Sequence, residues 1–526
     1  MKKLLLSLVF AVLSIGTINA QDIFDAIRFS QNFYEGTARF TSMGGAFAAL
    51  GGDFTTLSIN PAGVGVYRGS EVSMTPAISY SSTSSSYENI SDLPDSRTKF
   101  GLSNIGYVMS MYTGSKSKGL VTMNFGIGYN KLNNFNYNAS ASGRSIDEKH
   151  SFVSNILEQA YTVGYHVDEF TARRPYDGNM TLIDWPVVLA WQSNLITNIG
   201  TNAYISNYSY GNHSKHATTQ SKGNVGEYVF TFGGNVSHKL YFGLTFGIQD
   251  VNYESTRLYD EVMDNPTDLS YLIFDQYYRT SGIGYNLKAG LIYRPMPDLR
   301  LAFAVHTPTF FELTDEYSAY QRIDIINDGN YSASTPINQY EYRINTPYKL
   351  IGGFAYTFKS YGLISVDYEL VDYSSTRMKE HIDYWGTNSF DADNRVIKNS
   401  LKAASNFRVG IEGNLPAGFA LRAGYGFYGS PYKSSISNGD NYGYILADNG
   451  NVASSGYSMG IGDNTTNIYS AGVGYRFKNG FLDFGYSLTN SKTEYIIDAY
   501  NDYGIMAAVT TKNKFNRFAL TLGLRF

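Results

Sequence analysis

Apolar and polar residues alternate over the last ten positions of the chain. Phe518, Leu520, Leu522, Leu524 and Phe526 are separated by polar or small residues. A period of two residues is typical of a β-strand whose two faces meet different surroundings. The same repeat returns at 363–370, 419–427 and 481–488. The pattern therefore predicts many strands that each have one apolar face and one polar or small-residue face.

Short turns alternate with long polar segments between these predicted strands. Tight connections lie near 114–119, 236–239, 294–299, 359–362, 415–418 and 478–480. Long polar segments cover 82–99, 133–212, 259–270, 318–336, 381–401, 431–466 and 492–513. Six short turns and seven long loops give about fourteen strands, the first of them at 71–81. Short turns at one end and long loops at the other are typical of outer-membrane barrels.

The composition favours a membrane barrel over an array of soluble β-sandwiches. Charged residues make up 16% of the chain, against roughly 25% in ordinary soluble domains. The chain has 46 Tyr, 32 Phe and 52 Gly, and no apolar window after residue 20 reaches the length of a membrane helix. We expect an all-β fold, a transmembrane antiparallel β-barrel in contact with outer-membrane lipid. The amphipathic last strand, which ends at Phe526, resembles the strand that the barrel-insertion machinery reads.

The first twenty residues predict export. Two lysines precede an apolar core, and a small residue, Ala20, ends the segment, which is the pattern of a cleavable signal peptide. We expect a signal peptide at 1–20, an N-terminal hatch at 21–69 and the barrel at 70–526, with long extracellular loops at 133–212 and 431–466. The formal net charge of −4 argues against nucleic acid as a partner.

Residues 21–69 are predicted to plug the barrel. A fourteen-stranded barrel is too wide to be filled by its own side chains. Paired glycines at 44–45 and 51–52 allow backbones to approach closely, and a short helix is expected within 25–40. A nucleotide-binding loop does not fit, because the glycine spacing is wrong and Asp53 follows Gly52 where a P-loop has lysine.

The stretch SMGGAFAALGGDFTTLSINPAGVG at 42–65 resembles the hatch of the FadL-type transporters of hydrophobic compounds, the long-chain fatty acid and toluene transporter family. Segments 347–375 and 407–431 resemble the second half of that family, in the style of its Bacteroidetes members. The resemblance implies an extracellular hydrophobic groove and a kinked strand that releases ligand sideways into the membrane. It assigns the hatch or gate to Gly44, Gly45, Gly51, Gly52, Asp53, Asn60, Pro61, Ala62 and Gly63.

Two groups of apolar residues are candidates for ligand binding. The hatch group lines an internal pocket or forms the core of the hatch itself, and consists of Phe47, Leu50, Phe54, Leu57 and Ile59. The loop group forms a capture groove or packs a loop helix on the barrel rim, and includes Trp185, Val188, Leu189 and Trp191. Candidate lumen arginines either bind a ligand carboxylate or pair with lumen acids; they are Arg422, Arg476 and Arg517, and the acids are Asp367, Glu369 and Asp483.

These features predict passive uptake of a hydrophobic small molecule, such as a long-chain fatty acid, with release when the hatch around 60–63 shifts. Two alternatives stay open: a component of the type IX secretion machinery, and a haemin receptor that uses His213 and His216. The chain contains no H-E-x-x-H, and its G-x-S-x-G, at 456–460, lies in a predicted long polar loop. We therefore expect no enzymatic activity, no metal and no cofactor.

Overall fold

The structure is a computed structural model that describes residues 23–87, 90–114, 118–145, 151–163, 176, 185–200, 203–381, 390–433, 465–496 and 508–526. The predicted signal peptide at 1–20 and most of the predicted loop at 431–466 lie outside the described residues. No helix in these ranges is both long enough and apolar enough to cross a membrane.

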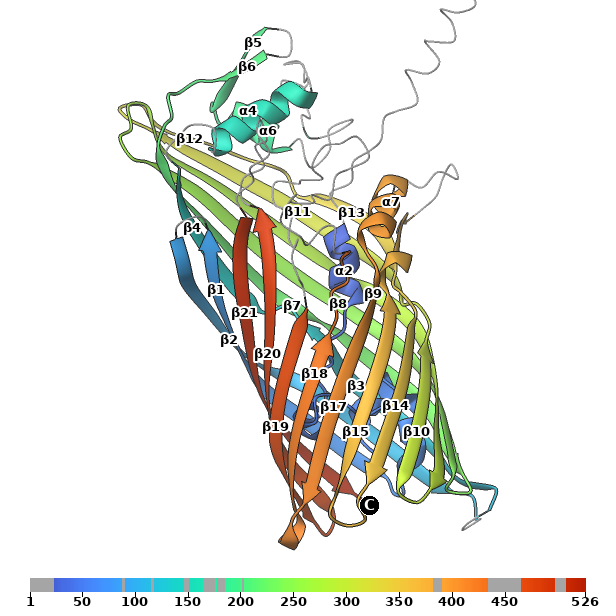
Figure 1. Ribbon diagram of the computed structural model, residues 1–526. Helices are drawn as coiled ribbons and strands as arrows, with labels where there is room; N and C mark the ends of the chain where they lie inside the picture. The colour runs from blue at the N-terminus through green and yellow to red at the C-terminus, as the bar shows by residue number, and fades with distance from the viewer. Residues whose placement is uncertain are drawn as a thin grey trace, which may run out of the picture.

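Fourteen antiparallel strand positions close into a barrel, as the alternation predicts (Figure 1). Ten positions are single strands: β1 (Glu71–Tyr87), β2 (Ile90–Tyr112), β7 (His213–Val236), β8 (Leu240–Met263), β9 (Leu269–Met296), β17 (Ala403–Asn414), β18 (Phe419–Tyr428), β19 (Thr466–Phe477), β20 (Gly480–Ile496) and β21 (Ala508–Arg525). Four positions are split in two: β3 (Leu120–Asn134) with β4 (Tyr137–Ser145), β10 (Leu299–His306) with β11 (Phe310–Ile325), β14 (Lys349–Thr357) with β13 (Asn338–Asn345), and β15 (Gly362–Asp372) with β16 (Arg377–Glu380). Pairing of β21 with β1 closes the barrel.

The six predicted tight turns are confirmed, and they lie at the same end of the barrel as the C-terminus (Figure 1). Three of the predicted loops are wrong over most of their length, because the strands continue through them. β1 and β2 run through 82–99, β8 and β9 take up much of 259–270, and β11 with β12 (Gly329–Ser334) fills 318–336. Ser-rich and Tyr-rich strands that rise above the membrane are polar on both faces, so their sequence is similar to that of a loop.

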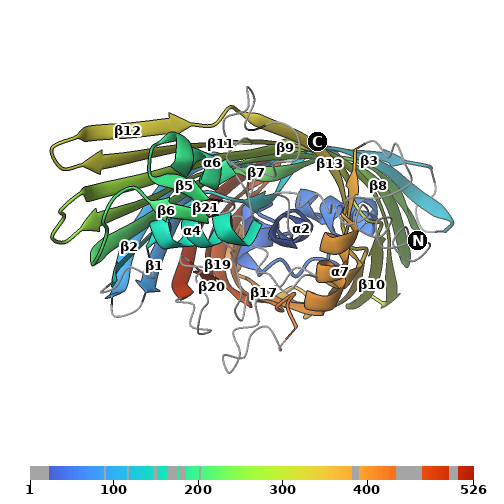
Figure 2. The same ribbon diagram turned by 90° about the horizontal axis from the view of Figure 1, so that it is seen from above.

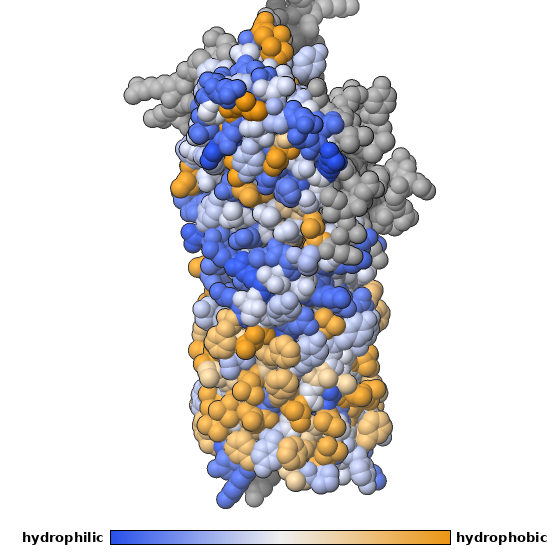
Figure 3. Space-filling model, turned by 90° about the vertical axis from the view of Figure 1, so that its left-hand side faces the viewer, coloured by the Kyte–Doolittle hydropathy of each residue, from blue (hydrophilic) through white to orange (hydrophobic). Residues whose placement is uncertain are grey.

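An apolar band surrounds the lower part of the barrel, and a polar surface lies above it (Figure 3). Large apolar side chains on the outward positions of the strands are exposed, as for Leu244, Leu287 and Leu421, at 60%, 58% and 54%. Such a band is what a bilayer requires of a membrane barrel. The closed barrel and its apolar band therefore fit an outer-membrane protein.

A helical cap packs on the end of the barrel opposite the C-terminus (Figure 1). It consists of α4 (Phe152–Val163), α6 (Trp185–Gln192) and the hairpin of β5 (Ile196–Gly200) and β6 (Ala203–Ser206). Its apolar residues form one buried cluster with the upper ends of β8, β9 and β11, including Leu272 and Ile323. A further helix, α7 (Asp391–Ser400), and two short 3₁₀ turns, η4 (Tyr373–Ser375) and η5 (Pro416–Gly418), complete the described elements outside the lumen.

Residues 23–69, called the N-terminal segment below, lie inside the barrel, and α2 is seen within the ring of strands from above (Figure 2). The segment contains α2 (Ile23–Ser30), α3 (Ala38–Ser42), η1 (Phe54–Ser58) and η2 (Pro61–Val66). α3 contacts β18 to β21, whereas η2 contacts β3 and β7 to β9 across the lumen. The short helix expected within 25–40 is present as α2, which ends at Ser30. A second helix, α3, follows, and Thr37 caps it by accepting a hydrogen bond from the backbone N–H of Phe40.

Glycines on ten strand positions face the N-terminal segment so closely that a Cβ atom at any of them would meet it within about 3 Å. We call this set the glycine belt: Gly106, Gly126, Gly128, Gly233, Gly243, Gly290, Gly353, Gly410, Gly424, Gly472 and Gly485. At Gly410, for example, a Cβ would lie 2.6 Å from the carbonyl oxygen of Met43. On β1 and β21, Ala77 and Ala519 pack against Ala38 instead. At these positions the backbone of the inner wall therefore packs directly against the N-terminal segment, with no wall side chain between them.

Gly353 and its neighbour Gly352 provide a matched test of the glycine belt. A Cβ at Gly353 would lie 2.9 Å from the Cβ of Ala48, whereas a Cβ at Gly352 has no atom within 4 Å. We expect Gly353→Val to lower the free energy of unfolding by about 1–3 kcal/mol through overpacking, and Gly352→Val to change it little. Urea unfolding of the protein refolded in phospholipid vesicles measures both; equal losses would contradict the belt.

Candidate functional site

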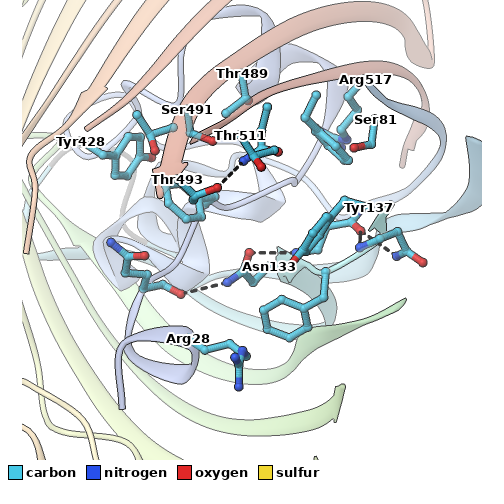
Figure 4. A pocket seen from close by; sticks show the side chains of 18 of the residues that line it. Arg28, Ser81, Asn133, Tyr137, Tyr428, Thr489, Ser491, Thr493, Thr511 and Arg517 are labelled. Atoms are coloured by element: carbon cyan, nitrogen blue, oxygen red, sulfur yellow. Dashed lines mark hydrogen bonds between the residues drawn. The ribbon is translucent and has the colours of Figure 1, made fainter. Parts of the chain in front are cut away.

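A cavity of about 370 Å³ lies in the upper half of the lumen, between the N-terminal segment and the barrel wall (Figure 4). Aromatic and aliphatic side chains form one part of its lining, namely Phe24, Ile27, Tyr34, Phe135, Tyr253 and Tyr428. These rings contact one another: Phe135 and Tyr253 meet edge to face with centroids 5.3 Å apart, and Phe33 meets Tyr428 at 5.1 Å. The cavity is thus able to hold an apolar molecule of small size.

The wall beside this cavity has a gap in its backbone ladder. β2 and β3 pair from Tyr112 only up to Asn104, opposite Asn130. Above that point β2 pairs with β1, while β4, after a break at 135–136, pairs with β7. Among the described residues, every hydrogen bond between β2 and β4 involves a side chain, for example the bond from Arg97 Nη1 to Asn138 Oδ1 at 3.2 Å.

The N-terminal segment covers the edge of β3 that β2 leaves unpaired. The N–H of Phe33 donates to the carbonyl oxygen of Leu132 at 2.9 Å, and the N–H of Glu35 donates to that of Lys131 at 2.9 Å. A free strand edge in a membrane protein needs such partners because lipid supplies none. Residues 33–35 therefore close the gap from inside.

Glu35 lies where β2, β3 and β21 meet at this gap. Its carboxylate accepts hydrogen bonds from Ser103 Oγ at 3.2 Å and from Asn134 Nδ2 at 2.8 Å. Lys131 Nζ lies 3.3 Å away and Arg517 Nε 3.6 Å away. Burial opposes ionisation of Glu35, but the two cations and the hydrogen bonds outweigh it and lower its pKa to about 2.

Lower in the lumen, wall side chains donate hydrogen bonds to backbone carbonyls of the segment. Asn124 Nδ2 reaches Val64 O at 2.6 Å, Thr245 Oγ1 reaches Leu57 O at 3.0 Å, and Lys288 Nζ reaches Ser58 O at 3.1 Å. Arg39 forms a bidentate pair with Glu412 of β17 at 2.8 and 3.0 Å. This part of the segment is thus fastened around the whole wall.

The nine predicted gate residues shape the turns of this fastened part. Gly44, Gly45, Gly51 and Gly52 all have positive φ, between 62° and 80°, which glycine adopts without strain. Asp53 caps η1 through the N–H of Thr55 at 3.0 Å. Asn60 caps η2 through the N–H of Ala62 at 3.1 Å, with Pro61 at its first position and Gly63 within it. Asn60 Nδ2 also donates to Ala48 O at 2.8 Å.

The structure places the predicted ligand-binding residues away from the cavity. Phe47, Leu50, Phe54, Leu57 and Ile59 are all at most 3% exposed and pack in the core of the segment or against the wall, and none lines the cavity. Trp185, Val188, Leu189 and Trp191 pack in the cap cluster. Ligand binding and packing are the two interpretations given for each group. In the structure both groups lie in packing positions.

The predicted lumen arginines pair with acids of the protein. Arg422 contacts Glu412 and Asp483, both at 2.6 Å, and Arg476 lies 3.6 Å from Glu412. Arg517 donates to Thr41 Oγ1 at 2.6 Å. Of the remaining predicted acids, Glu369 pairs with Arg408 and Asp367 accepts from the N–H of Ala48 at 2.8 Å.

The two histidines proposed for haem do not form a shared ligand pair. They are three residues apart on β7, so they lie on opposite faces of the strand. His213 is fully buried, with Nδ1 2.8 Å from the carbonyl oxygen of Gly211, whereas the His216 side chain is 47% exposed beside Asp260.

Sequence reasoning missed Glu35 and the aromatic lining of the cavity. These residues come from distant parts of the chain, and no local motif joins them. One signal was present: the asparagine-rich run NKLNNFNYN at 130–138 interrupts the strand alternation at the place where β3 breaks.

The ionisation of Glu35 generates a pH prediction. Its pKa of about 2, against an ordinary value of 4.5, corresponds to roughly 3 kcal/mol of stability. Because the folded pKa is depressed, this contribution is complete above pH 4.5 and is lost as the pH falls towards 2. We expect the stability difference between the native protein and Glu35→Gln to follow that course in unfolding midpoints. Glu312→Gln, at an exposed pair with Arg343, is the control; a difference that does not depend on pH would refute the role of ionised Glu35.

Comparison with solved structures identifies the fold. The chain is similar to a Pseudomonas aeruginosa FadL homologue with a TM-score of 0.52 and 12% identity, over 94% of this chain and 98% of that one. The Pseudomonas putida toluene transporter TodX gives 0.48 and 12% over 94% and 98%. The Ralstonia pickettii toluene transporter TbuX gives 0.46 and 14% over 93% and 98%.

No protein-family model matches the chain, and no curated protein matches its sequence. The likeness therefore rests on architecture: both this chain and the P. aeruginosa protein are aligned over nearly their whole length. The resemblance of the sequence to this family is confirmed at the level of fold: the chain has the same barrel fold as that FadL homologue.

Proposed function

We propose that the protein is an outer-membrane channel for passive uptake of hydrophobic small molecules. The observation that carries this proposal is the coincidence of two features at one height: the aromatic-lined cavity, and the gap where β2 leaves β3. Asn133 to Tyr137, on either side of the break in that strand position, line the cavity. The FadL-type fold supports the same function.

In the proposed route, a ligand enters from the extracellular side and occupies the cavity. The floor is closed, because the N-terminal segment is seated on the glycine belt and fastened to the wall by Asn124, Thr245 and Lys288. The ligand therefore leaves sideways, between β2 and the β3–β4 position, into the membrane. An apolar ligand on this route does not have to enter the aqueous periplasm, which its hydration would oppose.

We place the moving part of the hatch at 33–35 and the fixed part at the nine gate residues. Residues 33–35 border both the cavity and the gap, and two backbone hydrogen bonds hold them on β3. The turn at 60–63, by contrast, lies against Gly243 and Gly290 and is capped internally by Asn60. Movement of the fixed part would break many contacts at once, so release through 33–35 is the less costly path.

A disulfide between the N-terminal segment and β3 tests this route. The chain has no cysteine, so Glu35→Cys with Lys131→Cys introduces the only two thiols. Their backbones are hydrogen bonded at 2.9 Å, which puts the Cα atoms about 5 Å apart, within the range of a disulfide. We expect the oxidised protein to lose uptake of radiolabelled 1-naphthol, a neutral hydrophobic molecule, in Gram-negative cells that lack other channels of this fold, and the reductant to restore it.

The control pair for this experiment is Tyr320→Cys with Ser334→Cys, opposite one another in the extracellular hairpin of β11 and β12. Its oxidation should leave uptake unchanged. Uptake that persists in the oxidised Glu35–Lys131 pair would refute the movement of 33–35. Absence of uptake by the native protein, with a partner protein retained on purification, would favour the secretion-machinery alternative instead.

A further inference from the structure

The cavity has a second face that differs from the aromatic one. Lumen-facing positions of β19, β20, β21 and β1 carry hydroxyl and amide groups that border it (Figure 4). We call this set the hydroxyl patch: Ser81, Thr466, Ser487, Thr489, Ser491 and Asn513. The register makes it continuous, because Ser491 lies opposite both Thr466 and Asn513. Along β20 it extends over 487–491, about 13 Å at the usual rise of a strand.

The hydroxyl groups of the patch have no hydrogen-bond partner within the described part of the protein. Ser81, Ser487 and Thr466 are 3%, 6% and 6% exposed, and what they meet is the cavity. Asn513 donates through Nδ2 to Thr493 Oγ1 at 3.2 Å, but its Oδ1 is buried with no partner. Because these hydroxyl groups border the cavity, a ligand held there can supply their hydrogen-bond partners.

The arginines around the cavity already have interactions within the protein. Arg28 pairs with Asp25 and lies over the ring of Tyr253, 4.3 Å from its centroid. Arg517 is held by Thr41, Gly36 and Glu35, and Arg257 also has an interaction within the protein. A ligand carboxylate would therefore have to displace an existing partner, whereas neutral hydroxyl or carbonyl groups would not.

We infer that the ligand is a neutral amphiphile: a flat apolar molecule that carries hydroxyl or carbonyl groups along one edge. Its apolar body packs between Phe135, Tyr253 and Tyr428, where ring contacts are favourable. Its polar edge exchanges hydrogen bonds with Thr489, Ser491 and Asn513 across the cavity. This inference rests on the proposed function and narrows its substrate class, away from pure hydrocarbons and from fatty acid anions.

Three probes with the same biphenyl body test the inference. Biphenyl has no polar group, biphenyl-4-carboxylate is an anion, and 4,4′-dihydroxybiphenyl is neutral at pH 7 because phenols ionise near pH 10. Binding is measured by calorimetry on the protein in lipid nanodiscs, with empty nanodiscs subtracted. The decisive quantity is the ratio of Kd between variant and native protein for each probe, because partition into lipid cancels in that ratio.

The test variant is Thr489→Val with Ser491→Ala, which removes two free hydroxyls at nearly constant volume. We expect it to weaken binding of dihydroxybiphenyl by roughly tenfold and to change binding of biphenyl less than twofold. Thr489→Val alone should give an intermediate loss. The matched control is Thr267→Val with Ser332→Ala, two exposed positions outside the cavity, which should alter no probe.

The outcomes distinguish failure of the inference about the ligand from failure of the proposed uptake function. Equal changes for all three probes, or no change for dihydroxybiphenyl, would overturn the hydroxyl patch while leaving uptake of hydrophobic molecules standing. Tightest binding of biphenyl-4-carboxylate, lost on Arg517→Gln but kept in the test variant, would overturn it in favour of an anionic ligand. Failure of the native protein to bind any of the three would overturn the proposed function, and the inference with it.

Discussion

The close approach of the N-terminal segment to the inner wall is the constraint on which the rest of the structure depends. A barrel of fourteen strands is too wide for its own side chains to fill, and here backbone and side-chain atoms of the segment pack directly on the backbone of the wall. At Gly424 a Cβ would clash with Met43 and Gly44, and at Gly290 with Asn60. Glycine weakens a strand because it has no side chain to pack. Its presence at ten strand positions is therefore explained by the close approach of the N-terminal segment.

The height at which the N-terminal segment contacts the glycine belt determines where the cavity lies. Because the glycines lie in the lower half of the strands, residues 38–66 fill that half, and α2 lies higher in the lumen (Figure 1). The space left between α2 and the wall is the cavity. The same contact brings Glu35 to the point where β2 and β3 part. Cavity, gap and closing segment therefore follow from one packing arrangement.

Local patterns predicted the strands but not the site. Alternation and turn spacing depend on neighbours along the chain, so the strand number and the six turns could be predicted. The strands that extend above the membrane could not, because runs such as SSTSSSY at 81–87 have no apolar face. An apolar side chain in the hatch leaves Phe54 two possible roles, as a ligand contact or as part of the hatch core. Phe54 packs on Gly106 and Gly128, and that contact joins residues about 50 and 70 positions apart.

Polar side chains line both the cavity and the gap between β2 and β4, and they favour the same kind of ligand. The side chains that bridge β2 and β4 are themselves polar: Asp95 accepts from Ser140 at 2.8 Å, and Arg97 donates to Asn138. Their hydrogen bonds must open if a molecule is to pass, and a pure hydrocarbon would offer nothing in exchange, leaving them unpaired. A molecule with its own hydroxyl or carbonyl groups can replace them one at a time. The hydroxyl patch and the polar bridge thus select for the same kind of ligand, first by holding it and then by allowing it to leave.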